Sequence, residues 1–384
     1  SGFEGGNVAL TGIEIYKNYL PKTNCRECGF PTCLAFAIKL AQREVDPSLC
    51  PHLSEEARQA LEAQARPPIR LITIGSERSI EVGGEVVMFR HEKTFYHQPG
   101  IVVRIRDTEP PETALGIIDQ VANYRVERVG LELGLDGFAI ENTSGDSTTF
   151  IRCIELVRSK TDMPLVIMSN NPTAMNKALE VASQGRPLIY AATRDNLDDM
   201  VGLSLNYHCP LAVYEPGGLE GLSELVERAT GAGVEDIVLD PGARGFAESL
   251  TTLTQLRRLA LKKSLLGYPI ITFPGEGSET IEEEALLAGQ QVARYAGIVV
   301  LDHFSPALVY PLLTLRLNIY TDPQRPIQMT PGLYTIGSPR QDSPLCVTTN
   351  FSLTYFSIAG ELESSGFPSW LLVCDTEGLS VLTS

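Results

Sequence analysis

Four cysteines lie close together near the start of the chain, where they could bind a metal centre. They are separated by two, four and sixteen residues, and a proline follows the last of them: Cys25, Cys28, Cys33, Cys50 and then Pro51. Four thiolates are the ligand set of a [4Fe–4S] cluster, and a proline after the last cysteine is typical of bacterial ferredoxins. Structural zinc also accepts four cysteines, but usually from two C-x2-C pairs, and only one such pair is present here. The spacing therefore favours an iron–sulfur cluster over the alternatives of zinc and unligated thiols.

The other four cysteines are scattered singly through apolar runs, at Cys153, Cys209, Cys346 and Cys374. A secreted disulfide scaffold would be short and rich in cysteine throughout, unlike this chain of 384 residues. We therefore expect these four cysteines to be small buried hydrophobic residues.

The charge balance limits the kinds of partner. The chain has 31 Lys and Arg residues against 47 Asp and Glu residues, which gives a formal net charge of −16 at pH 7. Nucleic-acid binding depends on Lys and Arg displacing counterions, so this balance argues against a nucleic-acid partner. No apolar run approaches the roughly 20 residues of a membrane span, and the first residues lack the pattern of a signal peptide. We expect a cytoplasmic protein with no membrane span.

Helices are predicted on both sides of the cysteines, at residues 12–19, 34–43 and 54–65. The segment Arg66-Pro67-Pro68 then interrupts helical structure, because consecutive prolines fix φ and remove N–H donors. We place a domain boundary there. A hairpin of residues 71–74 and 85–90 is expected next, at the bottom or entrance of the following domain.

From about residue 100 the chain alternates between short apolar runs and longer amphipathic stretches. The predicted strands are residues 101–105, 128–133, 165–168, 188–191, 211–214, 236–239, 270–273 and 298–301. The predicted helices are residues 112–124, 148–160, 173–183, 194–206, 219–230, 246–263, 280–295 and 307–320. Eight strands that are each followed by a helix predict a (β/α)8 barrel, with a doubly wound open sheet as the alternative.

The loops after the strands, where barrels place their reactive groups, contain no recognisable catalytic motif. Asp240 and Arg244 could hold a polar ligand there, but an ion pair within a tight turn is the favoured interpretation. The five histidines form no ligand pair at helical spacing, and the common zinc-protease, serine-hydrolase and phosphate-loop motifs do not occur. Because a fold alone supplies no reaction, the barrel predicts no activity by itself.

After Tyr320 the sequence becomes rich in β-forming residues, at 346–349, 352–355, 370–375 and 379–382. An open β layer usually needs a covering helix. We therefore expect this region either to dock on the barrel or to continue into further structure.

The chain resembles one family from Thr11 to Ser384: the large (gamma) subunit of the corrinoid/iron–sulfur protein of the acetyl-CoA (Wood–Ljungdahl) pathway. The most specific stretches are residues 25–37, 187–192, 239–244, 318–323, 347–355 and 375–383. The resemblance implies an α/β protein with an N-terminal [4Fe–4S] domain (1–65), a TIM barrel (66–321) and the N-terminal part of a corrinoid-binding domain (322–384). Since the family's last domain is longer than residues 322–384, that domain is expected to be incomplete here.

The resemblance also implies which residues bind the two cofactors. Cys25, Cys28, Cys33 and Cys50 are expected to hold the cluster. The corrinoid (cobalamin) is expected to contact Thr348, Thr349, Thr354, Gly378, Leu379, Ser380, Val381 and Thr383. Residues 304–384 contain no histidine, and the D-x-H-x-x-G motif that supplies a lower axial ligand in many corrinoid proteins is missing. Binding is therefore expected to be base-off.

The implied function is that of a methyl-group carrier, with no residue assigned a catalytic role. Its cobalt would accept methyl from methyltetrahydrofolate or methyltetrahydropterin and deliver it to acetyl-CoA synthase, and the cluster would return Co(II) to Co(I). The implied partners are the small subunit, in a heterodimer, the methyltetrahydrofolate:corrinoid methyltransferase, acetyl-CoA synthase/CO dehydrogenase and a reductive activator. Two alternatives remain from the residues: an iron–sulfur electron-transfer subunit without corrinoid, and a barrel methylpterin methyltransferase.

Overall fold

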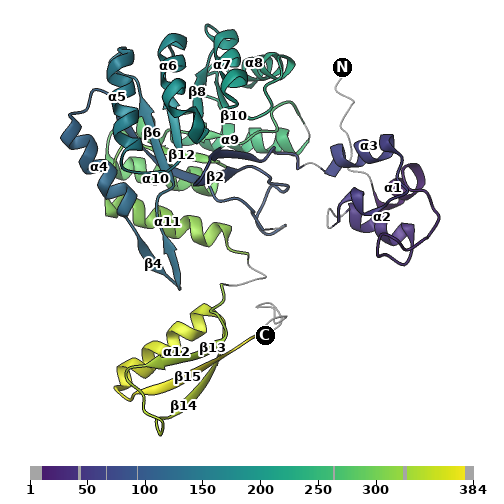
Figure 1. The fold of residues 1–384 in the computed structure, drawn as a ribbon, viewed down its shortest axis with the longest axis vertical. Helices are drawn as coiled ribbons and strands as arrows, with labels where there is room; N and C mark the ends of the chain where they lie inside the picture. The colour runs from purple at the N-terminus through teal and green to yellow at the C-terminus, as the bar shows by residue number, and fades with distance from the viewer. Residues whose placement is uncertain are drawn as a thin grey trace.

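The computed structural model of the chain describes residues 11–41, 45–65, 67–92, 94–262, 264–322 and 327–376. Three parts follow one another along the chain (Figure 1): a small group of helices, a barrel of strands and helices, and a small sheet with one helix. Every helix within these ranges is too short or too polar to cross a bilayer.

The N-terminal part consists of α1 (Gly12–Asn18), α2 (Cys33–Ala41), a 3-10 turn at Pro47–Leu49 and α3 (Glu55–Ala65). Thr11 begins α1 with a capping box, because its hydroxyl accepts from the Glu14 N–H while the Glu14 carboxylate accepts from the Thr11 N–H. The three predicted helices are therefore confirmed, except for residues 42 and 43, which lie outside the described ranges.

Eight parallel strands form the barrel in the spatial order β10-β9-β8-β7-β6-β3-β12-β11. They are β3 (Gly100–Arg106), β6 (Gly137–Glu141), β7 (Leu165–Met168), β8 (Leu188–Ala192), β9 (Leu211–Tyr214), β10 (Ile237–Asp240), β11 (Ile271–Thr272) and β12 (Ile298–Leu301). A parallel bridge between Leu239 and Ile270 closes the ring between its two ends. The closure confirms the predicted barrel and excludes the open sheet.

Helices cover the outside of this ring (Figure 1). They are α4 (Pro111–Asn123), α5 (Ser147–Arg158), α6 (Pro172–Ala182), α7 (Leu197–Tyr207), α8 (Leu219–Gly231), α9 (Phe246–Leu261), α10 (Ile281–Ala293) and α11 (Pro306–Tyr320). Asp146, Asn171, Thr280 and Ser305 cap their helices by accepting hydrogen bonds from first-turn N–H groups. The strands are buried on both faces, which explains their almost continuous apolar sequences.

The hairpin that precedes the barrel consists of β1 (Ile72–Gly75) and β2 (Ser79–Val82). Ile74 and Val82 pack in one cluster with residues inside the barrel, such as Val102 and Val166. The hairpin therefore closes one end of the barrel. Its first strand was predicted correctly, but its second strand is residues 79–82 rather than 85–90, because the chain turns back sharply after Gly75.

The second barrel strand was also predicted wrongly. Residues 128–133 are rich in β-forming side chains, but Val129 and Gly130 both have positive φ, 46° and 79°. Two such residues make a tight hairpin turn, which joins β4 (Val126–Arg128) to β5 (Leu131–Leu133) in a separate sheet. The barrel strand is β6 instead.

The C-terminal part contains β13 (Gly332–Ile336), β14 (Leu345–Thr349), α12 (Ser352–Ser365) and β15 (Ser369–Cys374). β15 lies in the centre, antiparallel to β13 and parallel to β14. Residues 352–355 were predicted as a strand and are helical, because two parallel neighbours such as β14 and β15 need a long crossover. Ala359 of this helix packs against Ile336 and Val373, so α12 is the covering helix that the sheet needs.

The scattered cysteines divide into two groups. Cys153 and Cys209 are buried as predicted, and burial raises the pKa of these thiols to about 12 and about 11. The prediction is wrong for Cys374, which is exposed, and Cys346 is only half-buried. Successive residues of a strand face opposite ways, so Cys374 lies on the face of β15 away from α12.

Candidate functional site

The fold brings the four N-terminal cysteines to one place. Cys33 and Cys50 are buried in the core of this part, Cys28 is half-buried at its edge and Cys25 is exposed. Burial raises the pKa of the Cys50 thiol, a hydrogen bond from the His52 backbone N–H opposes this, and the nearby thiols of Cys28, Cys25 and Cys33 raise it further. The other three thiols therefore all lie within electrostatic reach of the Cys50 thiol.

The loop before α2 has an unusual backbone. Lys22, Asn24, Arg26 and Gly29 have φ values of 60°, 51°, 69° and 83°. Left-handed residues in a loop turn backbone N–H groups toward a shared concave side, which is a common way to bind anions and iron–sulfur clusters. Here the Asn24 N–H donates to Cys33 Sγ at 3.3 Å, and Asn24 Oδ1 accepts from the Cys33 N–H at 2.8 Å. The backbone thus supplies N–H groups to the sulfur atoms.

A mixed metal site is a competing arrangement at the same place. The ligand atoms of Cys25, Glu27 and His52 lie within 4.8 Å of one another, and all three residues are exposed. His52 Nε2 and Glu27 Oε2 already interact at 3.0 Å. A single ion held by these residues would leave the two buried cysteines unused. The four thiols with their N–H donors fit a four-cysteine cluster better.

A second candidate site lies where β14 ends and α12 begins. The hydroxyl oxygens of Thr348, Thr349 and Ser352 are buried and have no hydrogen-bond partner among the described residues. Thr348 is 7% exposed and Ser352 is 1% exposed. A buried hydroxyl without a partner is costly, so these groups fit a ligand that bears hydrogen-bonding groups. Thr354 lies on the first turn of α12 and is exposed.

Ser352 was not singled out in the sequence. It lies between the predicted contacts Thr349 and Thr354, but residues 352–355 were expected to form a strand. The change from strand to helix buries its hydroxyl at a helix start where the preceding residue, Phe351, cannot cap with its side chain. A prediction of the crossover helix would have pointed to it.

The remaining predicted corrinoid contacts are Gly378, Leu379, Ser380, Val381 and Thr383, all of which lie outside the described residues. The chain nevertheless leads from β15 toward the same edge of the sheet. Thr349 is paired with Cys374 across the two parallel strands. Asn350 Oδ1 also accepts from the Thr376 N–H at 3.2 Å. The end of β14 and the last described residues are therefore neighbours.

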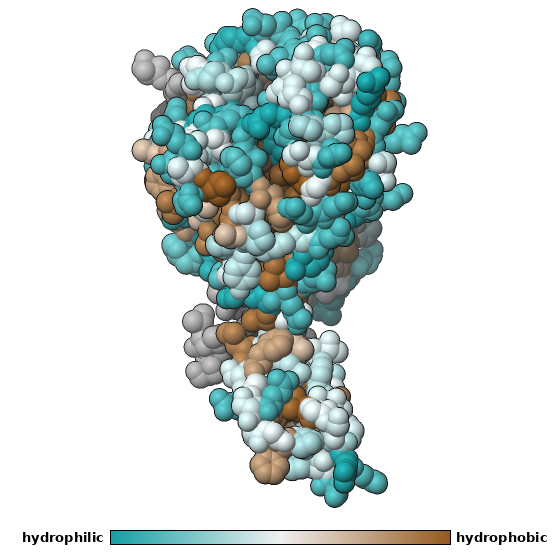
Figure 2. Space-filling view, turned by 90° about the vertical axis from the view of Figure 1, so that its left-hand side faces the viewer, coloured by the Kyte–Doolittle hydropathy of each residue, from teal (hydrophilic) through white to brown (hydrophobic). Residues whose placement is uncertain are grey.

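A cleft of about 430 Å³ adjoins this edge. Ser352 and Thr354 line it from the C-terminal part, and Arg128 and Asn318 line it from the barrel. Figure 2 shows mostly hydrophilic residues over the barrel, with hydrophobic residues at the surface where the barrel meets the C-terminal part. The cleft is thus a partly apolar space beside the unpartnered hydroxyls.

Charged side chains form a network at the carboxyl ends of β3, β10 and β12. Arg104 points inward from β3, is 3% exposed, and donates to Glu276 at 2.7 Å and to Asp302 at 2.5 Å. Burial raises the pKa of Asp302, but its hydrogen bonds to Arg104 and Arg106 outweigh this and hold the pKa below its usual value. Burial raises the pKa of Glu141, which lies 3.5 Å from Arg104.

Arg244 joins the same network. It binds Asp240 at 2.8 and 2.9 Å and Glu276 at 2.6 Å, while the Tyr190 hydroxyl donates to Asp240 at 2.6 Å. The turn is tight at Gly242, whose N–H donates to Asp240 at 2.8 Å. The predicted ion pair of Asp240 and Arg244 is confirmed. These ion pairs occupy part of the carboxyl end, where barrels usually place their reactive groups. A cavity of about 410 Å³ remains beside them, lined among others by Asn170, Arg194 and Glu215.

Two stretches of the chain match protein families. Residues 71–384 match the family "CO dehydrogenase/acetyl-CoA synthase delta subunit". Residues 20–52, which include all four clustered cysteines, match the family "Putative Fe-S cluster".

Individual relatives cover almost the whole chain. The "Corrinoid/iron-sulfur protein large subunit" of Moorella thermoacetica is 42% identical over 98% of this chain and 84% of its own length. The "Acetyl-CoA decarbonylase/synthase complex subunit gamma" of Methanothermobacter thermautotrophicus is 38% identical over 97% of this chain and 84% of its own length. Among solved structures, a dihydropteroate synthase from Xanthomonas albilineans has a TM-score of 0.44 and 15% identity, over 65% of this chain and 98% of its own.

Proposed function

This chain belongs to the family of corrinoid/iron–sulfur protein large subunits and acetyl-CoA decarbonylase/synthase gamma subunits, and we propose that it acts as the methyl-group carrier of the acetyl-CoA pathway. The observation that carries the proposal is the 42% identity to a corrinoid/iron–sulfur protein over 98% of the chain. The two candidate sites agree with it, because one offers four thiols and the other offers unpartnered hydroxyls beside a cleft.

We assign one task to each part of the chain: residues 1–65 hold the cluster, 66–321 form the barrel and 322–384 begin the corrinoid-binding domain. When bound, the corrinoid supplies a cobalt that accepts and releases a methyl group, and a [4Fe–4S] cluster supplies single electrons at low potential. The protein's share is to bind, orient and shield these groups.

Cys25, Cys28, Cys33 and Cys50 would hold the cluster. Buried Cys33 and Cys50 would shield it from water, and the N–H groups of Asn24 and His52 would stabilise negative charge on their sulfur atoms. Exposed Cys25 would leave one edge accessible to a redox partner. This arrangement suits electron exchange.

The corrinoid contacts would come from Thr348, Thr349, Thr354 and the segment Gly378, Leu379, Ser380, Val381 and Thr383, with Ser352 as an addition. Hydroxyl and backbone groups suit the amide side chains around the corrin ring. No histidine occurs in residues 304–384, so we propose base-off binding without a histidine from this domain. A weakly ligated cobalt is easier to reduce.

The partners we propose are a small subunit that completes a heterodimer, the methyltetrahydrofolate:corrinoid methyltransferase, acetyl-CoA synthase/CO dehydrogenase and a reductive activator. Residues 71–384 match a family named for a delta subunit, which supports a partner with a related barrel. Arg104 and Arg244 at the carboxyl end of this barrel are both engaged in the chain's own ion pairs, which also argues that the groups acting on the pterin come from another protein.

The proposal is tested by the content and reactivity of protein purified without oxygen together with its corrinoid. We expect about four iron and four sulfide ions per chain, and about one cobalt. Labelled methyl from methyltetrahydrofolate should reach the protein only when the methyltransferase is added. Electron paramagnetic resonance of the Co(II) state should show no splitting from an axial nitrogen.

Other results would favour the alternatives. Zinc in place of iron would contradict the cluster, and iron without any uptake of cobalt would indicate an electron-transfer subunit. Methyl turnover by this chain alone would indicate a barrel methyltransferase.

A substitution of Thr348 tests the corrinoid site without an activity assay. Thr348→Val keeps the shape but removes a buried hydroxyl that has no partner among the described residues, so the corrinoid-free protein should become more stable by about 1 kcal/mol. Corrinoid affinity should fall about tenfold, which is about 1.4 kcal/mol. Chemical denaturation and equilibrium binding measure the two effects.

The matched control is Thr335→Val, because Thr335 is an exposed residue of the same sheet. It should change neither quantity. If Thr348→Val destabilised the corrinoid-free protein and left its affinity unchanged, Thr348 would be a structural residue only.

A further inference from the structure

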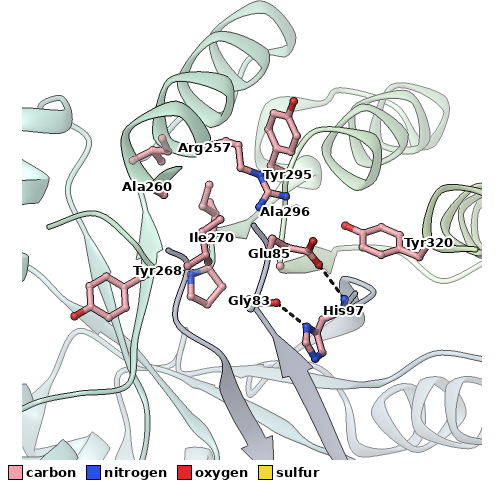
Figure 3. Close-up of a pocket in the computed structure, with 14 residues that line it drawn as sticks. Gly83, Glu85, His97, Arg257, Ala260, Tyr268, Ile270, Tyr295, Ala296 and Tyr320 are labelled. Atoms are coloured by element: carbon pink, nitrogen blue, oxygen red, sulfur yellow. Dashed lines mark hydrogen bonds between the residues drawn. The ribbon is translucent and has the colours of Figure 1, made fainter. Parts of the chain in front are cut away.

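A small, partly open cavity lies at the amino-terminal end of the barrel, opposite the charged network. Its volume is about 30 Å³. The segment after β2, the helix α9 and the residues just before β11 and β12 surround it (Figure 3). None of the residues assigned to the two candidate sites lines it.

Two buried charged side chains face each other across this cavity. Figure 3 shows Arg257 of α9 pointing toward Glu85, which follows β2. Arg257 is 4% exposed and Glu85 is 5% exposed. Each charge affects the pKa of the other group, yet no hydrogen bond joins Glu85 Oε2 to Arg257 Nε or Nη1. A gap therefore separates them.

The atoms on either side of the gap have no partners among the described residues. On Arg257 these are Nε and Nη1, and on Glu85 the atom is Oε2. The other Glu85 oxygen is already used, because it accepts from the Tyr96 and His97 N–H groups at 2.8 and 2.9 Å. The Arg257 guanidinium is held near the rings of Tyr295, at 4.7 Å, and Phe95, at 5.4 Å. The Glu85 carboxylate and the Arg257 guanidinium are therefore both held in place, and each has at least one atom without a hydrogen-bond partner among the described residues.

The atoms without partners on Glu85 and Arg257 determine which molecule or ion can occupy the gap between them. Glu85 Oε2 needs a donor, whereas the Arg257 N–H groups need an acceptor. A halide ion could only accept, and a metal cation could serve the carboxylate but not the guanidinium. Water donates and accepts, and a cavity of this size holds about one or two water molecules.

We propose that the cavity is a site for ordered water, in which a water molecule donates to Glu85 Oε2 and accepts from Arg257. The bridge completes the hydrogen bonding of both charged groups. It also has a mechanical role: Glu85 organises the loop at Tyr96 and His97, and His97 Nδ1 is bonded to the Gly83 carbonyl at 2.7 Å. The water therefore fastens the loop between the hairpin and the barrel to α9.

A crystal structure of the full chain at high resolution, with a second crystal soaked in bromide, tests the site directly. We expect a peak within about 3.2 Å of both Glu85 Oε2 and an Arg257 nitrogen, and no anomalous bromide signal there. An empty cavity, a bromide peak, or a direct contact between the two side chains would overturn the proposal.

A second measurement does not depend on crystals. Water-proton relaxation dispersion counts water molecules with long residence times, and Arg257→Met should lower that count by about one relative to the wild type. Arg258→Met is the matched control, since Arg258 is the next residue of α9 and is exposed. If Arg257→Met does not fold, the double variant Arg257→Met with Glu85→Met leaves no charge unpaired and should show the same loss. An unchanged count in a folded variant would overturn the proposal.

Discussion

Replacing Cys28 by alanine should abolish reductive reactivation of the protein while methyl transfer by protein loaded with already reduced corrinoid is retained. Cys28 is a proposed cluster ligand, and it is half-buried at the edge of the N-terminal core. Cys33 and Cys50 lie inside that core, so their replacement would also disturb packing. The Cys28 variant therefore separates loss of the cluster from loss of the fold. Iron per chain should fall from about four to below about one.

The matched control for this experiment is Cys153→Ala, which removes a buried cysteine of α5 in the barrel, outside both candidate sites. It should keep its iron and its reactivation. Reactivation that survives in Cys28→Ala together with full iron content would show that Cys28 is not a ligand. The visible absorption of the cluster and the rate of return to the reduced state are the two measurements.

Replacing Arg104 by methionine should lower the free energy of unfolding of the barrel by about 3–5 kcal/mol, because it strips a buried cation from its carboxylates. Arg104 is 3% exposed and binds both Glu276 and Asp302. Methionine fills similar space but leaves Glu276 with only Arg244, and Asp302 with only Arg106, as an arginine partner. Denaturant unfolding followed by circular dichroism measures the effect.

Arg228→Met is the matched control, because Arg228 pairs with Asp198 on the surface at 2.9 Å. Exposed pairs contribute less than about 1 kcal/mol, so this variant should remain close to the wild type. Equal losses in the two variants would contradict the importance of the buried network.

The same variant should change the response to acid. The pKa of Asp302 lies below its ordinary value of 3.8 in the folded protein, since hydrogen bonds to Arg104 and Arg106 outweigh the effect of burial. A carboxyl group with a lowered pKa stabilises the fold above its unfolded pKa, and this contribution is lost as the pH falls through the folded pKa. The wild type should therefore lose stability below about pH 4, and Arg104→Met should show less of this loss.

Features that depend on residues close together in the chain could be predicted from the sequence. The cysteine spacing identifies the N-terminal site because the ligands of a small cluster must be close along the chain or in a short loop. The apolar runs identify most barrel strands, since a parallel strand covered on both faces must be apolar throughout. The barrel strand β6 was not predicted, because residues 128–133 have the stronger β pattern. Those residues form a hairpin whose turn has two left-handed residues.

Other features depend on contacts between distant residues. Arg104 meets Glu276 and Asp302 across 172 and 198 positions, so no local pattern predicts the network. Ser352 was missed for a related reason, because its burial depends on the helix that crosses from β14 to β15. β propensity is high at 352–355, and tertiary pairing of the flanking strands overrides it.

The single bridge between Leu239 and Ile270 gives the barrel a seam. β11 has two residues and pairs with β12 at those two positions, whereas β12 and β3 pair at four. Because few interstrand hydrogen bonds hold β11, separating it from its neighbours costs little free energy. We therefore expect the barrel to open transiently at β11 before it opens elsewhere. Ile270 also lines the cavity beside Arg257 and Glu85. The proposed water therefore lies next to this weakly paired part of the barrel. Its hydrogen bonds to Glu85 and Arg257 would limit how far the strands can separate there.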